Sequence, residues 1–115
     1  MYNYKQLDQE QCDFVAIASR FEVADGERLF IQVDDLPIVV FNIAGSLFAI
    51  GDVCSHDDGP LGDGDLDQFE VTCPRHGAVF DVRSGKVLSL PAIVDIPAYP
   101  VRIEDDQILV GVPKK

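Results

Sequence analysis

The sequence contains no tryptophan, one methionine, two histidines and three cysteines among its 115 residues. Without tryptophan, aliphatic side chains and the seven phenylalanines must form the core. An odd number of cysteines and no secretory leader argue against a disulfide framework. A chain of this length is expected to form one domain, residues 1–115.

Basic residues are scarce as well. Nine Lys and Arg stand against twenty Asp and Glu, which gives a net charge of −11. Nucleic acids and anionic membranes both favour clustered positive charge, so neither is expected as a partner. The acidity suits a carrier that meets basic patches on other proteins, although it also serves simple solubility.

Long apolar runs are absent too. The richest stretch, residues 36–44, is about half the length of the ~18-residue run that a membrane-spanning helix needs, and it contains Pro37 and Asn42. The N-terminal residues lack the apolar segment of a signal peptide. We therefore expect a soluble, cytoplasmic protein.

Short β-branched and aromatic runs, separated by turn residues, indicate an all-β fold. The expected strands span 15–18, 28–33, 37–43, 46–50, 68–73, 78–82, 99–103 and 107–112. Ala44-Gly45 and Asp105-Asp106 lie between such runs and predict tight hairpins. The segment 7–13 offers no apolar stripe, so no helix is expected there. This pattern predicts an antiparallel sandwich or barrel.

Six of the nine glycines fall within residues 51–85 and interrupt this pattern. Glycine lets the backbone approach a ligand closely, so the loops of this region are expected to wrap around something. Two of these loops hold the metal-capable side chains: Cys54 and His56 in the first, and Cys73 and His76 in the second. Both histidines of the chain are used here, which predicts a metal site built from two knuckles.

The mixed composition of each knuckle bears on the identity of the metal. A zinc site accepts two thiolates and two imidazoles, but its usual spacing puts the cysteines in one knuckle and the histidines in the other. A two-iron cluster with both cysteines on one iron and both histidines on the other asks for one of each per loop. The spacing favours an iron–sulfur cluster, with a single zinc as the alternative.

The stretches DVCSHDDGPLGDG (52–64) and VTCPRHGAVFDVRSGK (71–86) resemble the Rieske [2Fe–2S] motif. From about residue 14 to residue 112 the chain is similar to the Rieske ferredoxins of bacterial aromatic-ring dioxygenase systems. The resemblance implies an antiparallel Rieske-type sandwich with a small cluster-binding subdomain of two loops, about residues 51–91. It assigns Cys54 and Cys73 to a buried iron, and His56 and His76 to an outer iron.

Four residues near these ligands differ from the high-potential respiratory branch of that family. Its two extra cysteines, joined as a disulfide, correspond to Gly59 and Arg75 here. Its serine and tyrosine, whose hydroxyls donate to the cluster sulfurs, correspond to Ala78 and Phe80. Such hydrogen bonds favour the reduced cluster, so their absence predicts a midpoint potential at the low end of the Rieske range of roughly −150 to +300 mV.

The resemblance implies a one-electron carrier that is not itself an enzyme. It would pass electrons from a flavin-dependent NAD(P)H reductase to a terminal oxygenase, as a monomer that docks weakly on basic surfaces of its partners. No glycine-rich phosphate loop is present, so NADH is expected to bind another protein. Cys12, outside both loops, is expected to be a small buried hydrophobe.

Two other functions are also compatible with this sequence. One is the Rieske-like small subunit of an assimilatory nitrite reductase, some members of which lack the cluster ligands that this chain keeps. The other, from a different class, is a zinc-stabilised interaction module that uses the same two loops.

Overall fold

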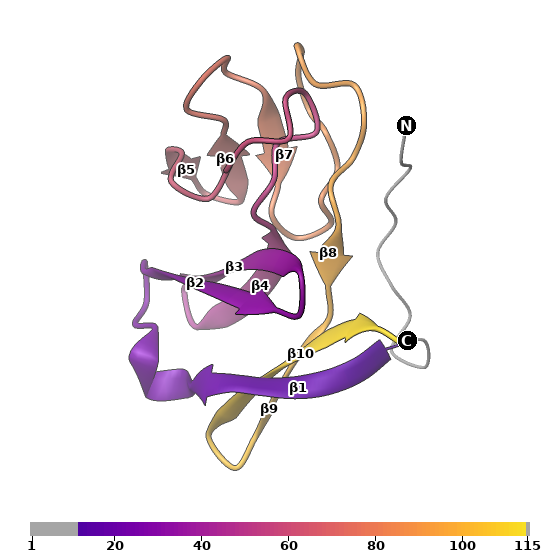
Figure 1. Ribbon diagram of the computed structural model, residues 1–115. Helices are drawn as coiled ribbons and strands as arrows, with labels where there is room; N and C mark the ends of the chain where they lie inside the picture. Colours follow the sequence, from indigo (N-terminus) through magenta and orange to yellow (C-terminus); the bar gives the residue numbers. More distant parts are fainter. Residues whose placement is uncertain (1–11, 115) are drawn as a thin grey trace.

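The computed structural model describes residues 12–114, which form ten short strands and one 3₁₀ turn (Figure 1). In chain order these are β1 (Cys12–Ser19), η2 (Arg20–Glu22), β2 (Arg28–Val33), β3 (Leu36–Ile43), β4 (Ser46–Gly51), β5 (Leu66–Asp67), β6 (Glu70–Thr72), β7 (Val79–Asp81), β8 (Ala98–Tyr99), β9 (Val101–Glu104) and β10 (Gln107–Pro113). All pairings are antiparallel, in the sheets β1-β10-β9, β2-β3-β4-β8 and β5-β6-β7. The all-β prediction is confirmed. Within residues 12–114 no helix is long and apolar enough to cross a bilayer.

The two hairpins predicted from dipeptides are present. Ala44 and Gly45 have φ of 54° and 89°, and Asp105 and Asp106 have φ of 51° and 64°. Two successive left-handed residues form the turn whose twist matches that of the flanking strands. At the first hairpin Asn42 Oδ1 accepts a hydrogen bond from the Gly45 N–H at 2.9 Å, which fixes the turn.

One predicted strand is divided. Residues 99–103 read as a single strand, but the chain changes sheets at Pro100: β8 pairs with β4, and β9 pairs with β10. Proline has no N–H to donate to a strand ladder, whereas its carbonyl accepts a hydrogen bond from the Gly111 N–H. The 3₁₀ turn η2 was not expected either; it starts at a reciprocal capping box between Ser19 and Glu22.

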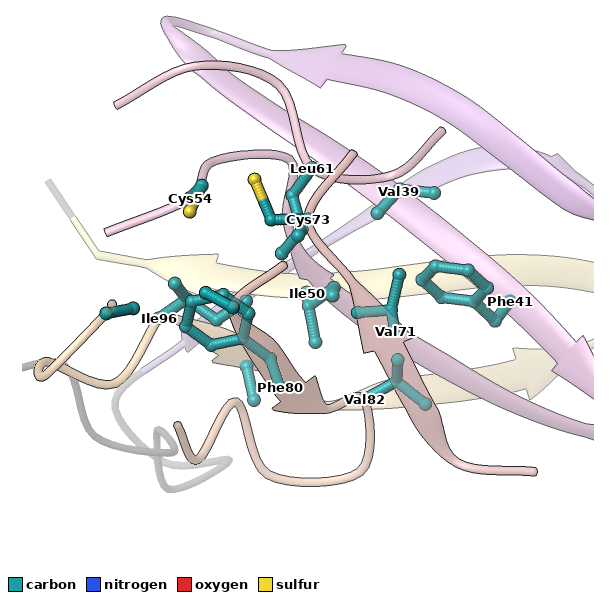
Figure 2. Packing of buried hydrophobic residues seen from close by; sticks show 13 residues of the cluster. Val39, Phe41, Ile50, Cys54, Leu61, Val71, Cys73, Phe80, Val82 and Ile96 are labelled. Carbon is teal, nitrogen blue, oxygen red and sulfur yellow. The ribbon is translucent and has the colours of Figure 1, made fainter. Parts of the chain in front are cut away.

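Strand β3, in the sheet β2-β3-β4-β8, is buried on both faces. Ile38 and Val40 of β3 belong to a core shared with β1, β9 and β10, whereas Val39 and Phe41 belong to a core shared with β6 and β7. All four side chains are fully buried. Because successive residues of a strand point to opposite faces, one strand contributes to two cores. We call the second one the cysteine core, because it also contains both motif cysteines (Figure 2).

The segment between β4 and β8 lies at one end of the molecule and is fixed to the middle sheet by two polar side chains (Figure 1). Arg28 of β2 donates to the carbonyls of Gly62 and Gly64 at 2.5 and 2.7 Å. Asp52, directly after β4, accepts from the N–H groups of Leu61 and Gly62 at 2.9 and 2.6 Å. These contacts hold the chain between the two motifs in a fixed position.

Candidate metal centre

Each motif forms a turn closed on its cysteine. In the first loop (residues 54–60), the Cys54 N–H donates to the Gly59 carbonyl and the Cys54 carbonyl accepts from the Asp58 N–H. In the second loop (residues 73–78), the Cys73 N–H donates to the Ala78 carbonyl and the Cys73 carbonyl accepts from the Gly77 N–H. The backbone thus sets where both cysteines point.

The two motif cysteines lie together at one end of the cysteine core (Figure 2). Cys54 is 0% exposed and Cys73 is 2% exposed. Burial raises the pKa of the Cys54 thiol, and the adjacent Cys73 thiol raises it further. Two neighbouring thiols in an apolar environment need a cation to be stable as thiolates, and thiolates are the form that binds metal.

The two histidines form a pair on the solvent side. Their ring centroids are 5.0 Å apart at an interplanar angle of 80°, and both side chains are exposed. A nitrogen of each ring and a carboxylate oxygen of Asp57 all lie within 4.8 Å of one another. The structure therefore places the four predicted residues as a buried thiol pair and an exposed imidazole pair.

Arg75 makes the contact that the sequence did not reveal. Its Nε and one terminal nitrogen donate to the two carboxylate oxygens of Asp57 at 2.6 and 2.8 Å, and its other terminal nitrogen donates to the Pro60 carbonyl at 2.5 Å. The hydrogen bonds from this guanidinium hold the pKa of Asp57 well below its usual range. A Cβ built on Gly59 would lie 2.7 Å from the Arg75 Cζ, so glycine leaves the space that the side chain fills.

The family resemblance already indicates that positions 59 and 75 lie close together. It assigns the extra cysteines of the respiratory branch to positions 59 and 75, and a disulfide requires close neighbours. The structure brings these two positions into contact, with a charged side chain over a glycine.

A third loop, residues 88–97, contacts the first loop and the start of β7. The Ser55 hydroxyl of the first loop donates to the Val94 carbonyl, and Ser89 Oγ accepts from the Val79 N–H at 3.1 Å. This loop contains Pro91, and its Leu90 and Ile93 side chains are 75% and 68% exposed.

The two positions that carry a serine and a tyrosine in the respiratory branch have no hydroxyl here. Ala78 and Phe80 are fully buried in the cysteine core, and neither side chain can donate a hydrogen bond. Cys12 lies at the start of β1, buried and outside the cysteine core, as expected for a small hydrophobe.

Residues 13–100 match the Rieske [2Fe-2S] domain. The chain belongs to this family. Its donor set fits the cluster, because a Rieske centre takes two thiolates on one iron and two imidazoles on the other. The cofactor is therefore a Rieske-type [2Fe–2S] cluster, and the zinc alternative is not supported.

The relatives narrow the family to its ferredoxins. The chain is 42% identical over 94 residues to the ferredoxin component of biphenyl 2,3-dioxygenase from Rhodococcus jostii (strain RHA1), covering 82% of this chain and 88% of that protein. The ferredoxin of carbazole 1,9a-dioxygenase from Nocardioides aromaticivorans IC177 superposes with a TM-score of 0.80 at 32% identity, over 88% of this chain and 98% of that chain. A chain in the complex of reduced oxygenase and oxidised ferredoxin of carbazole 1,9a-dioxygenase gives a TM-score of 0.80 at 25% identity, over 89% and 95%. The predicted resemblance to dioxygenase ferredoxins is confirmed, and with it the assignment as an electron-transfer protein and not an oxygenase.

Proposed function

We propose that this chain is the ferredoxin of an aromatic-ring dioxygenase system, and that it carries single electrons from a flavin-dependent NAD(P)H reductase to a terminal oxygenase. The observation that carries the proposal is the separation of the donor set into a buried thiol pair and an exposed imidazole pair. The ferredoxin components named above, at 42% and 32% identity, support it over the nitrite reductase alternative.

Cys54 and Cys73 are proposed to hold the inner iron, and His56 and His76 the outer iron. When bound, the cluster supplies a reversible one-electron oxidation and reduction. The cysteine core keeps water away from the thiolates, whereas the imidazoles lie at the surface, where a partner can approach within electron-transfer distance. The geometry therefore gives the protein one protected side and one electron port.

A low midpoint potential is part of the proposal. Ala78 and Phe80 supply no side-chain hydrogen bond to stabilise the extra electron. The net charge of −11 further disfavours adding a negative charge. We expect a value at the low end of the Rieske range of roughly −150 to +300 mV, and a midpoint above about +100 mV at neutral pH would contradict this.

The partners are proposed to present basic docking surfaces. The acidity of the chain favours steered encounters, and small interfaces allow the rapid exchange that a shuttle needs. The complex of oxygenase and ferredoxin in the carbazole system supports an oxygenase as one of the two partners.

Aerobic purification followed by iron, sulfide and zinc analysis and a visible spectrum tests the proposal. We expect a reddish-brown protein with two irons and two sulfides per chain and an electron paramagnetic resonance signal after dithionite reduction. Reconstitution with a flavoprotein reductase and a dioxygenase should then restore NADH-dependent turnover. A colourless protein with stoichiometric zinc would overturn the proposal.

A further inference from the structure

Arg75 joins the two ligand loops from outside the cysteine core. It stands between the two ligands of the second loop, and its three hydrogen bonds to Asp57 and Pro60 all go to the first loop, 15 and 18 residues away in sequence. No disulfide links the two loops in the part of the chain that the structure describes. Besides the His56–His76 ring pair, a charged side-chain contact therefore joins the two loops.

The geometry of this link differs from that of an ordinary surface ion pair. Isolated exposed pairs contribute little, because two long side chains must be ordered and water screens the charges. Here the guanidinium donates in fork geometry to both carboxylate oxygens and also to a backbone carbonyl. The carboxylate is oriented in advance, since Asp57 Oδ1 also accepts from the Gly59 N–H at 3.0 Å.

The pair also lies next to an imidazole. The Asp57 Oδ2 atom is 4.0 Å from His76 Nε2 and 2.6 Å from Arg75 Nε. With Arg75 in place, the carboxylate charge beside the imidazole is balanced. Without it, a single negative charge stands next to the proposed outer ligand.

We propose that Arg75 is a latch residue that holds the two ligand loops closed over the cluster and balances the charge of Asp57 at the outer iron. The inference rests on the proposed function, because it assumes that the two loops bind the cluster. Arg75 is a positioning residue in this scheme: it acts through the loops and through Asp57 and does not bind the metal itself.

The chain offers a matched control. Arg83 also donates to both carboxylate oxygens of an aspartate, Asp81, at 3.1 and 2.9 Å. That pair lies two residues apart in the turn after β7 and joins no separate loops. An Arg83→Gln variant therefore removes an equally charged fork without touching the proposed latch.

The test compares cluster release and midpoint potential in holoprotein variants. The loss of visible absorbance measures the rate at which iron is transferred to a chelator. Arg75→Gln and Asp57→Asn should release iron about tenfold faster than the unchanged protein, the factor that corresponds to one lost charge-assisted contact, and Arg83→Gln should release it at the unchanged rate. Arg75→Lys, which keeps the charge and loses the fork, should release iron at an intermediate rate.

The potentials separate a latch that balances charge from a merely structural contact. Arg75→Gln leaves the Asp57 carboxylate unbalanced and should lower the midpoint potential, whereas Asp57→Asn leaves Arg75 unbalanced and should raise it. Arg75→Lys should stay close to the unchanged protein. Simple loosening of the loops would move the first two variants in the same direction.

Each outcome has a defined meaning. The latch is overturned if the Arg75→Gln variant of a coloured holoprotein releases iron at the unchanged rate. It is also overturned if the midpoint potentials of Arg75→Gln and Asp57→Asn shift in the same direction. Both results leave the proposed function intact. A purified protein that holds no iron and no sulfide overturns both the latch and the proposed function.

Discussion

Val39 and Val40 allow the two cores of this protein to be tested separately. They are adjacent on β3, both side chains are fully buried, and they point to opposite faces of the sheet. Val39 lies in the cysteine core, where a Cβ on Gly62 would lie 3.1 Å from the Val39 Cβ. Val40 lies in the core shared with β10. Substitution of each by alanine is the same chemical change in two places.

The expected cost follows from burial. Val→Ala removes the equivalent of two buried methylene groups, which lowers the free energy of unfolding by about 1.6 kcal/mol at ~0.8 kcal/mol each. The cavity left behind raises this loss to about 2–3 kcal/mol. Both variants should therefore unfold at about 1–2 M lower urea by far-ultraviolet circular dichroism. Only Val39→Ala removes packing from the core that contains Cys54 and Cys73, so it alone should also speed iron release to a chelator in the absence of urea. Equal acceleration by Val40→Ala would refute the separation of the two cores.

Four further predictions follow from the same structure. Arg28→Met keeps the apolar stem but loses the two hydrogen bonds to the carbonyls of Gly62 and Gly64, at a cost of about 1–3 kcal/mol. Amide hydrogen exchange at residues 61–64 should therefore become faster, and unchanged exchange would contradict the anchoring role of Arg28. Metal removal should make Cys54 and Cys73 reactive to a thiol reagent, because the two loops that carry them lose the ligand they share, while Cys12 in strand β1 stays buried; three equally reactive thiols in native buffer would speak against this. Electron transfer to the oxygenase should slow as ionic strength rises from about 20 to 300 mM, whereas a flat profile would exclude charge steering. Light scattering should give the 12.6 kDa monomer, and a stable dimer would contradict that expectation.

The sequence was sufficient for those features that depend on local pattern. Ala44-Gly45 and Asp105-Asp106 predict hairpins because each dipeptide lies between apolar runs, and the turn geometry bears this out. The pairing of one cysteine with one histidine in each loop points to the family without reference to the fold. Local spacing carries this information because each loop is a short closed turn around its cysteine.

Features that depend on tertiary contact could not be read in this way. From the sequence, Pro100 lies in the interior of one strand. Only the folded chain shows that the strand passes from one sheet to another at this residue. The Arg75–Asp57 fork joins residues 18 apart, and nothing in the spacing shows that the guanidinium turns toward the first loop and not toward solvent. Its place depends on the approach of Arg75 to Gly59, which is a property of the folded chain.

Pulsed electron paramagnetic resonance on the dithionite-reduced protein detects whether two imidazoles bind the cluster. With histidine labelled by nitrogen-15, we expect couplings from two imidazole nitrogens in the unchanged protein, and loss of one coupling or of the cluster in His56→Cys and His76→Cys. A signal without any imidazole coupling, or a protein that gives no signal because it holds zinc, would contradict the assignment of Cys54, Cys73, His56 and His76 as the ligands of a Rieske cluster.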